Sequence, residues 1–225
     1  MAKAETTKLA HNTATVAASD EQLGATLAAY HVQAAAALAR QAKREESGNT
    51  AHAFEKVFNP IFWTVSASVL LAWAALEANI NQLIKKFEDE NAGNTGRIER
   101  CSFLYGEQVI LKYKGLARLK EQELSESDEI FKNFETFGDF RNALVDFQPE
   151  WHDEEEKHAK LCKRMREILK PLAGIPPEAV FPFCHFGYEC AKWAVVTASG
   201  VSKHYATLIG VEDHLAASWL DLQLP

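Results

Sequence analysis

Hydrophobic residues recur at helical spacing along most of the chain, in long runs separated by short segments rich in glycine, proline or asparagine. The first run predicts a helix over residues 20–46, because Ser19 can cap it and no glycine or proline follows Gly24 within it. Its alanine-rich middle, residues 34–39, combines high helix propensity with close packing. Without an internal repeat in the sequence, the pattern favours one all-α bundle with a common core.

The second run predicts the central helix of the fold. It is expected to start near Pro60, since proline suits a first helical turn, and to continue without a breaker to Asn91. Residues 61–83 are apolar on nearly every face, which predicts a long and deeply buried helix. The uncharged stretch over residues 59–76 has an apolar part shorter than the ~20 residues that cross a bilayer. A buried core helix is therefore predicted in place of a membrane span.

Several shorter helices are predicted in the rest of the chain, and glycine residues set most of their limits. Gly106 and Gly115 leave the continuity of the third helix open, and Gly138 with Asp139 is expected to break or redirect the chain. The predicted ranges are 97–124, 127–137, 140–147, 150–170, from 178 or 183 to 209, and a short tail helix that ends near 222.

Composition and charge limit what the protein can be. The length of 225 residues suits one core, so residues 19–225 are predicted to form a single helical domain behind a disordered leader over residues 1–18. The net charge of −7 opposes bulk attraction to polyanions, and a nucleic-acid role therefore needs a local basic site. Four cysteines without a CxxC pair are typical of reduced thiols in a cytoplasmic protein, and neither a metal site nor a cofactor is predicted.

The common catalytic and metal-binding motifs are not found. Glu155 and His158 have the i, i+3 spacing of a di-iron bundle, but that site needs the motif twice, and no other histidine has a glutamate three residues before it. His158 is therefore predicted to be solvated on a charged face. The sequence contains no glycine-rich phosphate loop and no GxSxG turn. Interleaved phenylalanines are predicted to be core residues and not a base-stacking platform: Phe131, Phe134, Phe137, Phe140 and Phe147.

Two short segments carry the remaining functional signal: residues 75–84, ALEANINQLI, and residues 140–151, FRNALVDFQPEW. The first places an acidic residue and an asparagine at the polar end of the central helix, and the second pairs Arg141 with Asn142. Together they resemble the HEPN superfamily of small helical domains. In that family an Arg, commonly followed by Asn or another polar residue, precedes a His by four to six residues. The resemblance covers roughly residues 61–209 in helix order.

The resemblance implies a HEPN-like helical bundle with a site at these two segments. Arg141 and Asn142 match the Arg-Asn positions of the family, and Glu77 and Asn81 match the acidic residue and the asparagine of its core helix. Many members are metal-independent ribonucleases that dimerise, so that the Arg and His of both protomers line one cleft. Others bind RNA or serve as structural and regulatory modules. The resemblance therefore implies a homodimer without a metal or a cofactor.

The sequence departs from the family pattern at the position of the histidine. Asp146 stands there, and Phe147 and Gln148 occupy the other spacings that the pattern allows. A histidine with an ordinary pKa near ~6.5 both accepts and donates protons near neutrality, whereas an aspartate with an ordinary pKa near ~3.9 is an anion that hardly donates one. Such an anion also repels phosphate. The pattern therefore predicts a degenerate ribonuclease site.

Two structural interpretations of the second segment stay open beside this one. In the first, Arg141 and Asp146 form an ion pair whose net stabilisation is small. In the second, Arg141 and Asn142 cap and solvate a helix start behind Asp139 and bind no ligand.

From the sequence we expect an RNA-binding, antitoxin-binding or regulatory module in the cytoplasm, with RNA or an antitoxin-like protein as its partner and no membrane. The first alternative is an active metal-independent endoribonuclease, such as a toxin or a defence effector. The second is a purely structural interaction protein, because nothing in the chain requires RNA.

Overall fold

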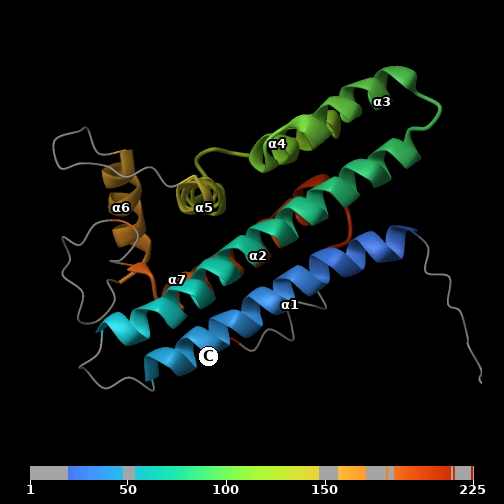
Figure 1. The fold of residues 1–225 in the computed structure, drawn as a ribbon. Coiled ribbons are helices and arrows are strands. Elements are labelled where there is room, and N and C mark those ends of the chain that lie inside the picture. Colours follow the sequence, from blue (N-terminus) through green and yellow to red (C-terminus); the bar gives the residue numbers. More distant parts are fainter. Residues whose placement is uncertain are drawn as a thin grey trace, which may run out of the picture.

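Helices make up the regular structure of the chain. The computed structural model describes residues 20–47, 54–146, 157–170, 181, 185–213, 215 and 224. Within these ranges it contains α-helices, one 3-10 helix and no strand, so the predicted all-α fold is confirmed (Figure 1). The elements are α1 (Asp20–Ser47), α2 (Phe54–Glu90), α3 (Thr95–Ser102), η1 (Phe103–Gly106), α4 (Val109–Leu119), α5 (Glu129–Val145), α6 (Lys157–Ile168) and α7 (Tyr188–Ile209).

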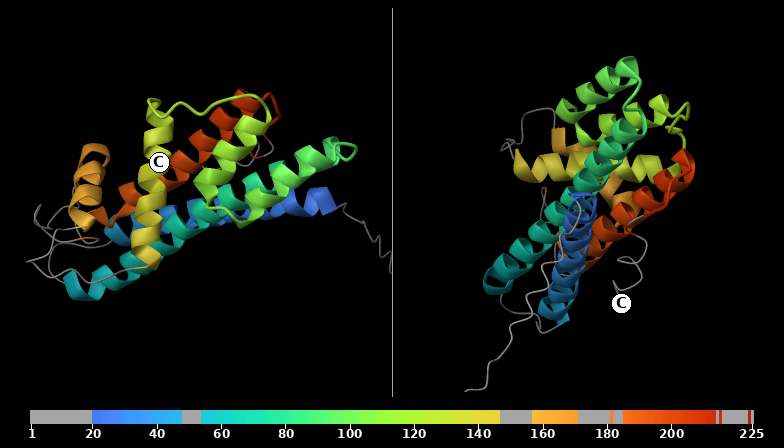
Figure 2. Two further views of the ribbon diagram at one scale, coloured as in Figure 1. Left: turned by 90° about the horizontal axis from the view of Figure 1, so that it is seen from above. Right: turned by 90° about the vertical axis from the view of Figure 1, so that its right-hand side faces the viewer.

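The three longest helices form the base of the fold. α1 runs antiparallel to α2, and α7 lies beside α2 and runs in the same direction (Figures 1 and 2). Ser68 Oγ of α2 donates a hydrogen bond of 2.8 Å to the backbone oxygen of Ala35 in α1. The rings of Phe62 in α2 and Phe186, just before α7, stack with their centroids 4.7 Å apart. Small side chains permit the close approach of α1, whose buried alanines include Ala35, Ala36, Ala39 and Ala42.

α5 crosses over α2 and α7 on the side away from α1 (Figures 1 and 2). At the crossing, the ring centroid of Phe137 lies 5.2 Å from that of Trp73 in α2 and 5.5 Å from that of Trp193 in α7. A Cβ atom on Gly138 would lie 3.0 Å from both Ile110 Cδ1 and Trp73 Cη2, so glycine permits this close contact. The predicted break at Gly138 is therefore wrong, because the glycine serves helix packing within a continuous α5.

The helix predicted over residues 97–124 is divided into α3, η1 and α4. The division follows Gly106, after which the backbone is extended at Gln108 before α4 begins. Gly115 does not interrupt α4, and the Leu104 side chain occupies the space that a Cβ atom would need there. Of the two glycines that left the continuity of this helix open, only Gly106 lies at a break.

The limits of the long helices agree with the sequence pattern to different degrees. α1 matches its predicted range to within one residue. α2 starts at Phe54, so Pro60 lies in its second turn and not in its first. α7 starts at Tyr188, after an extended Gly187, and so begins later than the predicted start at residue 178 or 183.

Some predictions fall on residues that the structure does not describe. These are the disordered leader over residues 1–18, the tail helix that ends near residue 222, and the first part of the helix predicted over residues 150–170. α6 confirms the later part of that helix. The single domain over residues 19–225 stays a prediction.

The apolar run of α2, residues 61–83, is largely shielded from solvent. Val65, Val69 and Leu76 are fully buried, whereas Trp63 is 66% exposed and Leu70 is 37% exposed. These two are the only exposed residues of the run, so the predicted deep burial of residues 61–83 agrees with the structure.

The same helix is the one membrane-span candidate in the described part of the chain. Pro60–Glu90 is long and apolar enough to cross a membrane by length and composition, yet half of its most apolar window is buried inside the structure. The core helix of a soluble protein has the same properties.

A series of buried polar side chains joins α2, α4 and α7. The Tyr113 hydroxyl donates to the backbone oxygen of Leu76 at 3.2 Å, and Asn79 Nδ2 lies 3.4 Å from that hydroxyl. Asn79 Nδ2 also lies 3.4 Å from Ser202 Oγ, which donates to Asp213 Oδ1 at 3.0 Å. Burial raises the pKa of the Tyr113 phenol well above its usual value, so the hydroxyl keeps its proton. Because buried polar groups are costly unless they are bonded, this network fixes the relative positions of the three helices.

Replacement of Ser202 by alanine is expected to lower the free energy of unfolding by about 1 to 3 kcal/mol, because it leaves the buried Asn79 amide with one partner fewer. Denaturant unfolding followed by circular dichroism measures the difference. Ser102→Ala is the matched control, since the Ser102 hydroxyl donates a hydrogen bond to the backbone oxygen of Glu99 on an exposed surface. This change should alter the free energy of unfolding by less than about 0.5 kcal/mol. Equal effects of the two changes would contradict a structural role of the network.

Candidate functional site

The last turns of α5 carry the Arg-Asn pair that the sequence singled out. Arg141 lies one turn after Phe137, whose fully buried ring anchors α5 at the crossing with α2 and α7. Arg141 Nη1 donates a hydrogen bond of 3.0 Å to Asn142 Oδ1. Asn142 and Asp146 are exposed, and Arg141 is partly exposed. Asp146 is the C-cap residue of α5, and its backbone N–H donates a hydrogen bond of 2.8 Å to the backbone oxygen of Asn142.

The structure contradicts the Arg141–Asp146 ion pair of the first structural interpretation and the helix start of the second, whereas the expectation that Arg141 and Asn142 bind no ligand stays a prediction. Arg141 and Asp146, which are both described, form no ion pair within 4.0 Å, and residues five apart project from different sides of a helix. Arg141 and Asn142 lie near the end of the continuous α5, so they do not cap a helix start behind Asp139. Asp139 instead pairs with α6, since its Oδ2 lies 2.5 Å from Arg164 Nη2. In the described part of the chain, the Arg141 guanidinium is therefore oriented by an amide and not by a carboxylate.

The second predicted group, Glu77 and Asn81 on α2, is joined by a residue that the sequence did not single out. Lys112 Nζ of α4 donates to Asn81 Oδ1 at 2.9 Å and lies 3.7 Å from Glu77 Oε1. The Lys112 side chain is only 4% exposed, whereas that of Glu77 is 45% exposed. Lys112 lies three residues after Val109 and four before Leu116, on the apolar face of α4, and a lysine on such a face is the signal that could have identified it.

The two groups flank the crossing of α2 and α5. Trp73 and Gly138 meet at that crossing, and Glu77 and Arg141 each lie roughly one helical turn beyond it on their own helices. Within the described residues, no hydrogen bond or ion pair links Arg141 to Glu77 or Asn81. The structure therefore forms the two predicted groups separately and places both near the same helix crossing.

The chemistry available at α5 is that of a cation with free donors. A guanidinium carries five N–H donors in a planar fork that matches phosphate oxygens, and Asn142 uses only one of them in the described structure. Asp146 has an exposed carboxyl group at the helix end, and its oxygens can accept hydrogen bonds. The arrangement suits phosphate binding better than proton transfer.

The remaining histidine and thiol predictions concern groups away from this site. His158 is not simply solvated, because its ring packs against that of Phe181 with the centroids 4.9 Å apart. Among the described cysteines, Cys101, Cys162 and Cys190 are buried. Burial raises the pKa of Cys101 to about 11, and Glu88 adds to that shift. No three His, Cys, Asp or Glu side chains gather as metal ligands within the described ranges.

Comparisons with protein-family models, with curated proteins and with solved structures found no match to this chain. The functional interpretation therefore depends on the two segments, on the positions of their side chains and on the all-α fold.

Proposed function

We propose that this protein is a cytoplasmic HEPN-like helical module that binds RNA through Arg141 at a site that does not cleave it. The observation that carries the proposal is the state of Arg141, whose guanidinium is held by Asn142 at 3.0 Å without a carboxylate partner among the described residues. A guanidinium that is oriented but not neutralised is suited to bidentate contact with a phosphate.

Asp146 supports the second half of the proposal. A ribonuclease that works without a metal needs a side chain that both accepts and donates a proton near neutrality, and a carboxylate does this poorly. The exposed carboxylate also adds negative charge close to the phosphate that Arg141 would bind. RNA is therefore held and not hydrolysed.

The proposal includes a homodimer, since a two-fold axis brings the same surface together twice and would place two copies of Arg141 near one RNA. Exposed apolar side chains on α2 and α5 are available for such an interface. They are Trp63 and Leu70 of α2 and Val145 of α5, which are 66%, 37% and 50% exposed.

Replacement of Arg141 by alanine is expected to weaken RNA binding about tenfold or more, because a hydrogen bond to a charged group contributes about 1.5 to 3 kcal/mol. Fluorescence anisotropy of a labelled single-stranded RNA, measured over a range of salt concentrations, gives both the affinity and its salt dependence. The salt slope should fall by about 0.7 for each phosphate contact that is lost.

Arg97→Ala is the matched control for this measurement. Arg97 is an exposed arginine of α3 that, like Arg141, donates to an asparagine, here Asn91 at 3.2 Å. Arg97→Ala changes the net charge by the same amount as Arg141→Ala but leaves the proposed site intact. If both variants bound RNA as the unaltered protein does, Arg141 would not be the phosphate-binding residue.

A further inference from the structure

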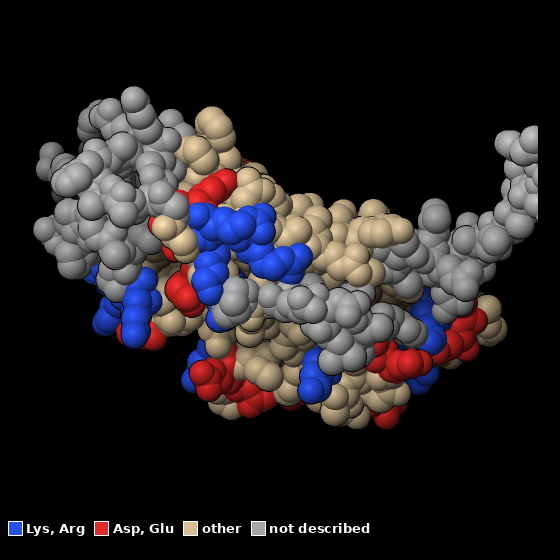
Figure 3. All heavy atoms as spheres, turned by 90° about the horizontal axis from the view of Figure 1, so that it is seen from below, with Lys and Arg blue, Asp and Glu red and all other residues tan. Residues whose placement is uncertain are grey.

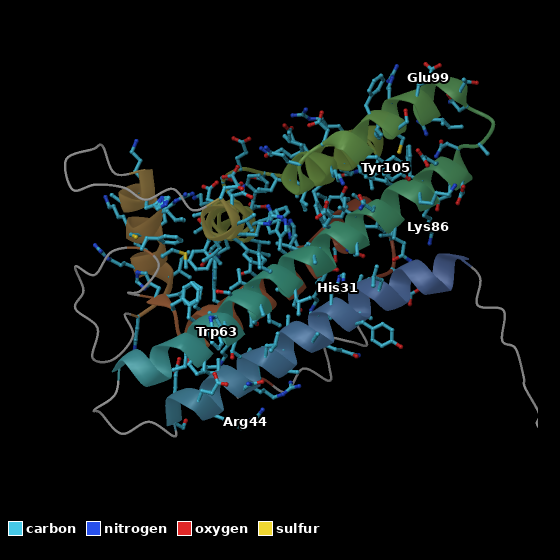
Figure 4. The ribbon with its side chains drawn as sticks, in the orientation of Figure 1. His31, Arg44, Trp63, Lys86, Glu99 and Tyr105 are labelled. Carbon is cyan, nitrogen blue, oxygen red and sulfur yellow. The ribbon has the colours of Figure 1, made fainter. Side chains whose placement is uncertain are left out.

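A group of cationic side chains gathers where the end of α1 meets the start of α7. Lys43 Nζ of α1 lies 5.1 Å from the centroid of the Tyr188 ring, and Lys192 Nζ of α7 lies 5.6 Å from the same centroid. Arg40 and Arg44 lie one turn apart on α1 and flank Lys43. We name these four residues, Arg40, Lys43, Arg44 and Lys192, the α1–α7 basic surface. Figure 3 shows Lys and Arg side chains gathered on this underside of the molecule, and Arg44 is labelled in Figure 4.

Two acidic residues at this surface, Glu45 and Glu46, are used in other contacts. Glu46 Oε1 accepts a hydrogen bond from the backbone N–H of Tyr188, in the first turn of α7. Burial raises the pKa of Glu46, while the Tyr188 N–H opposes that shift. Glu45 accepts from Thr64 Oγ1 at 3.1 Å. Within the described residues, neither Lys43 nor Arg44 has a carboxylate within 4.0 Å, so positive charge remains at the surface.

The start of α7 carries charges of both signs. Its N-cap residue, Gly187, has no side chain to accept a hydrogen bond from the first turn, and the N-terminus of a helix carries a partial positive charge, whereas the exposed Glu189 in the first turn is acidic. The rest of the protein has the opposite sign, since the net charge is −7. A polyanion is therefore repelled by the molecule as a whole and attracted locally at the α1–α7 basic surface.

We infer that the α1–α7 basic surface binds the phosphate backbone of RNA as a second contact region, an inference that rests on the proposed function. Backbone contacts need accessible cations and no shaped pocket, and a guanidinium group binds phosphate oxygens in pairs. Arg44 is exposed, and Arg40, Lys43 and Lys192 are partly exposed. The surface joins the end of α1 to the start of α7, whereas α5, which carries Arg141, crosses α2 and α7 on the side away from α1 (Figures 1 and 2). The two regions therefore contact RNA independently within one protomer.

The test uses the full chain with Arg40, Lys43, Arg44 and Lys192 changed to glutamine, and the same labelled single-stranded RNA. The variant is expected to bind at least tenfold more weakly at low salt, and its salt slope should be smaller by about 2 to 3, since each lost phosphate contact contributes about 0.7. The control replaces two exposed arginines and two exposed lysines on other faces: Arg97, Arg100, Lys132 and Lys203. Binding equal to that of the control overturns the inference.

A second variant keeps the test valid if the four changes weaken the fold. Arg44 lies in the last turn of α1, where basic residues also stabilise the helix, so circular dichroism is compared for every variant. Lys192→Gln alone leaves α1 untouched and should lower the salt slope by about 0.7. Tighter binding of polyglutamate than of RNA by the unaltered protein would assign the surface to an acidic protein and overturn the RNA assignment.

The outcomes for the two RNA-contact regions are distinguishable. If the glutamine variant loses affinity and Arg141→Ala does not, the α1–α7 basic surface is supported and the proposed site at Arg141 fails. If only Arg141→Ala loses affinity, the proposed function is supported and the inference fails. Absence of salt-dependent RNA binding by the unaltered protein overturns both.

Discussion

Replacement of Asp146 by histidine is expected to raise metal-independent RNA cleavage about a hundred- to ten-thousand-fold above that of the unaltered protein, which should cleave RNA slowly or not at all. A positioned acid or base contributes a factor of this size. Arg141 and Asn142 already lie in place, so the missing step is proton transfer. Position 146 is also the C-cap of α5, where the helix dipole favours a protonated imidazole.

The measurement compares cleavage of a mixed RNA pool in the presence of a chelator. Asp146→Asn is the matched control, because it removes the negative charge without supplying an acid or a base. The double variant with Asp146→His and Arg141→Ala should not cleave RNA if Arg141 binds the phosphate. Rapid cleavage by the unaltered chain would refute the degenerate site and favour an endoribonuclease, whereas a folded Asp146→His protein without activity would limit the HEPN resemblance to the fold.

Replacement of Phe137 by alanine is expected to lower the free energy of unfolding by about 3 to 5 kcal/mol, the usual cost of removing a large buried aromatic side chain. Phe137 is fully buried, and its ring lies edge-on to Trp73 of α2 and Trp193 of α7, at 5.2 and 5.5 Å between centroids. The change removes one of the contacts that hold α5 to these two helices, beside those of Phe134 with Trp73 and of Phe140 with Trp193. Urea unfolding followed by tryptophan fluorescence gives the difference.

Two further variants separate packing from other effects of this change. Phe103→Ala removes the same side chain from η1, where it is 76% exposed, and should change stability by less than about 0.5 kcal/mol. Phe137→Leu keeps most of the buried volume and should cost less than Phe137→Ala. Since Arg141 lies one turn after Phe137, RNA binding by Phe137→Ala should also weaken when the protein is still folded. A loss of stability no larger than that of Phe103→Ala would contradict the placement of α5.

The sequence by itself determined the class of the fold and much of its core. The helix over residues 20–46 is found almost as predicted, because a cap at one end and breakers at the other are local signals. Four of the five phenylalanines predicted to be core residues, Phe131, Phe134, Phe137 and Phe140, are buried, and the fifth lies outside the described residues. Helical periodicity records which face of a helix avoids water, and this information is local to each segment.

The tertiary structure decided what each local signal means. Gly138 has the sequence signature of a break, yet it lies inside α5, because Trp73 and Ile110 from two other helices occupy the space that its side chain would fill. Trp63 belongs to an apolar run, yet it is 66% exposed.

The same holds for the candidate site. Lys112 joins Glu77 and Asn81 from a helix more than thirty residues away in sequence, at 3.7 and 2.9 Å. Arg141 and Asp146 are only five residues apart and do not pair. Contacts between separate helices depend on how their surfaces fit together, and the pattern within one helix does not contain that information.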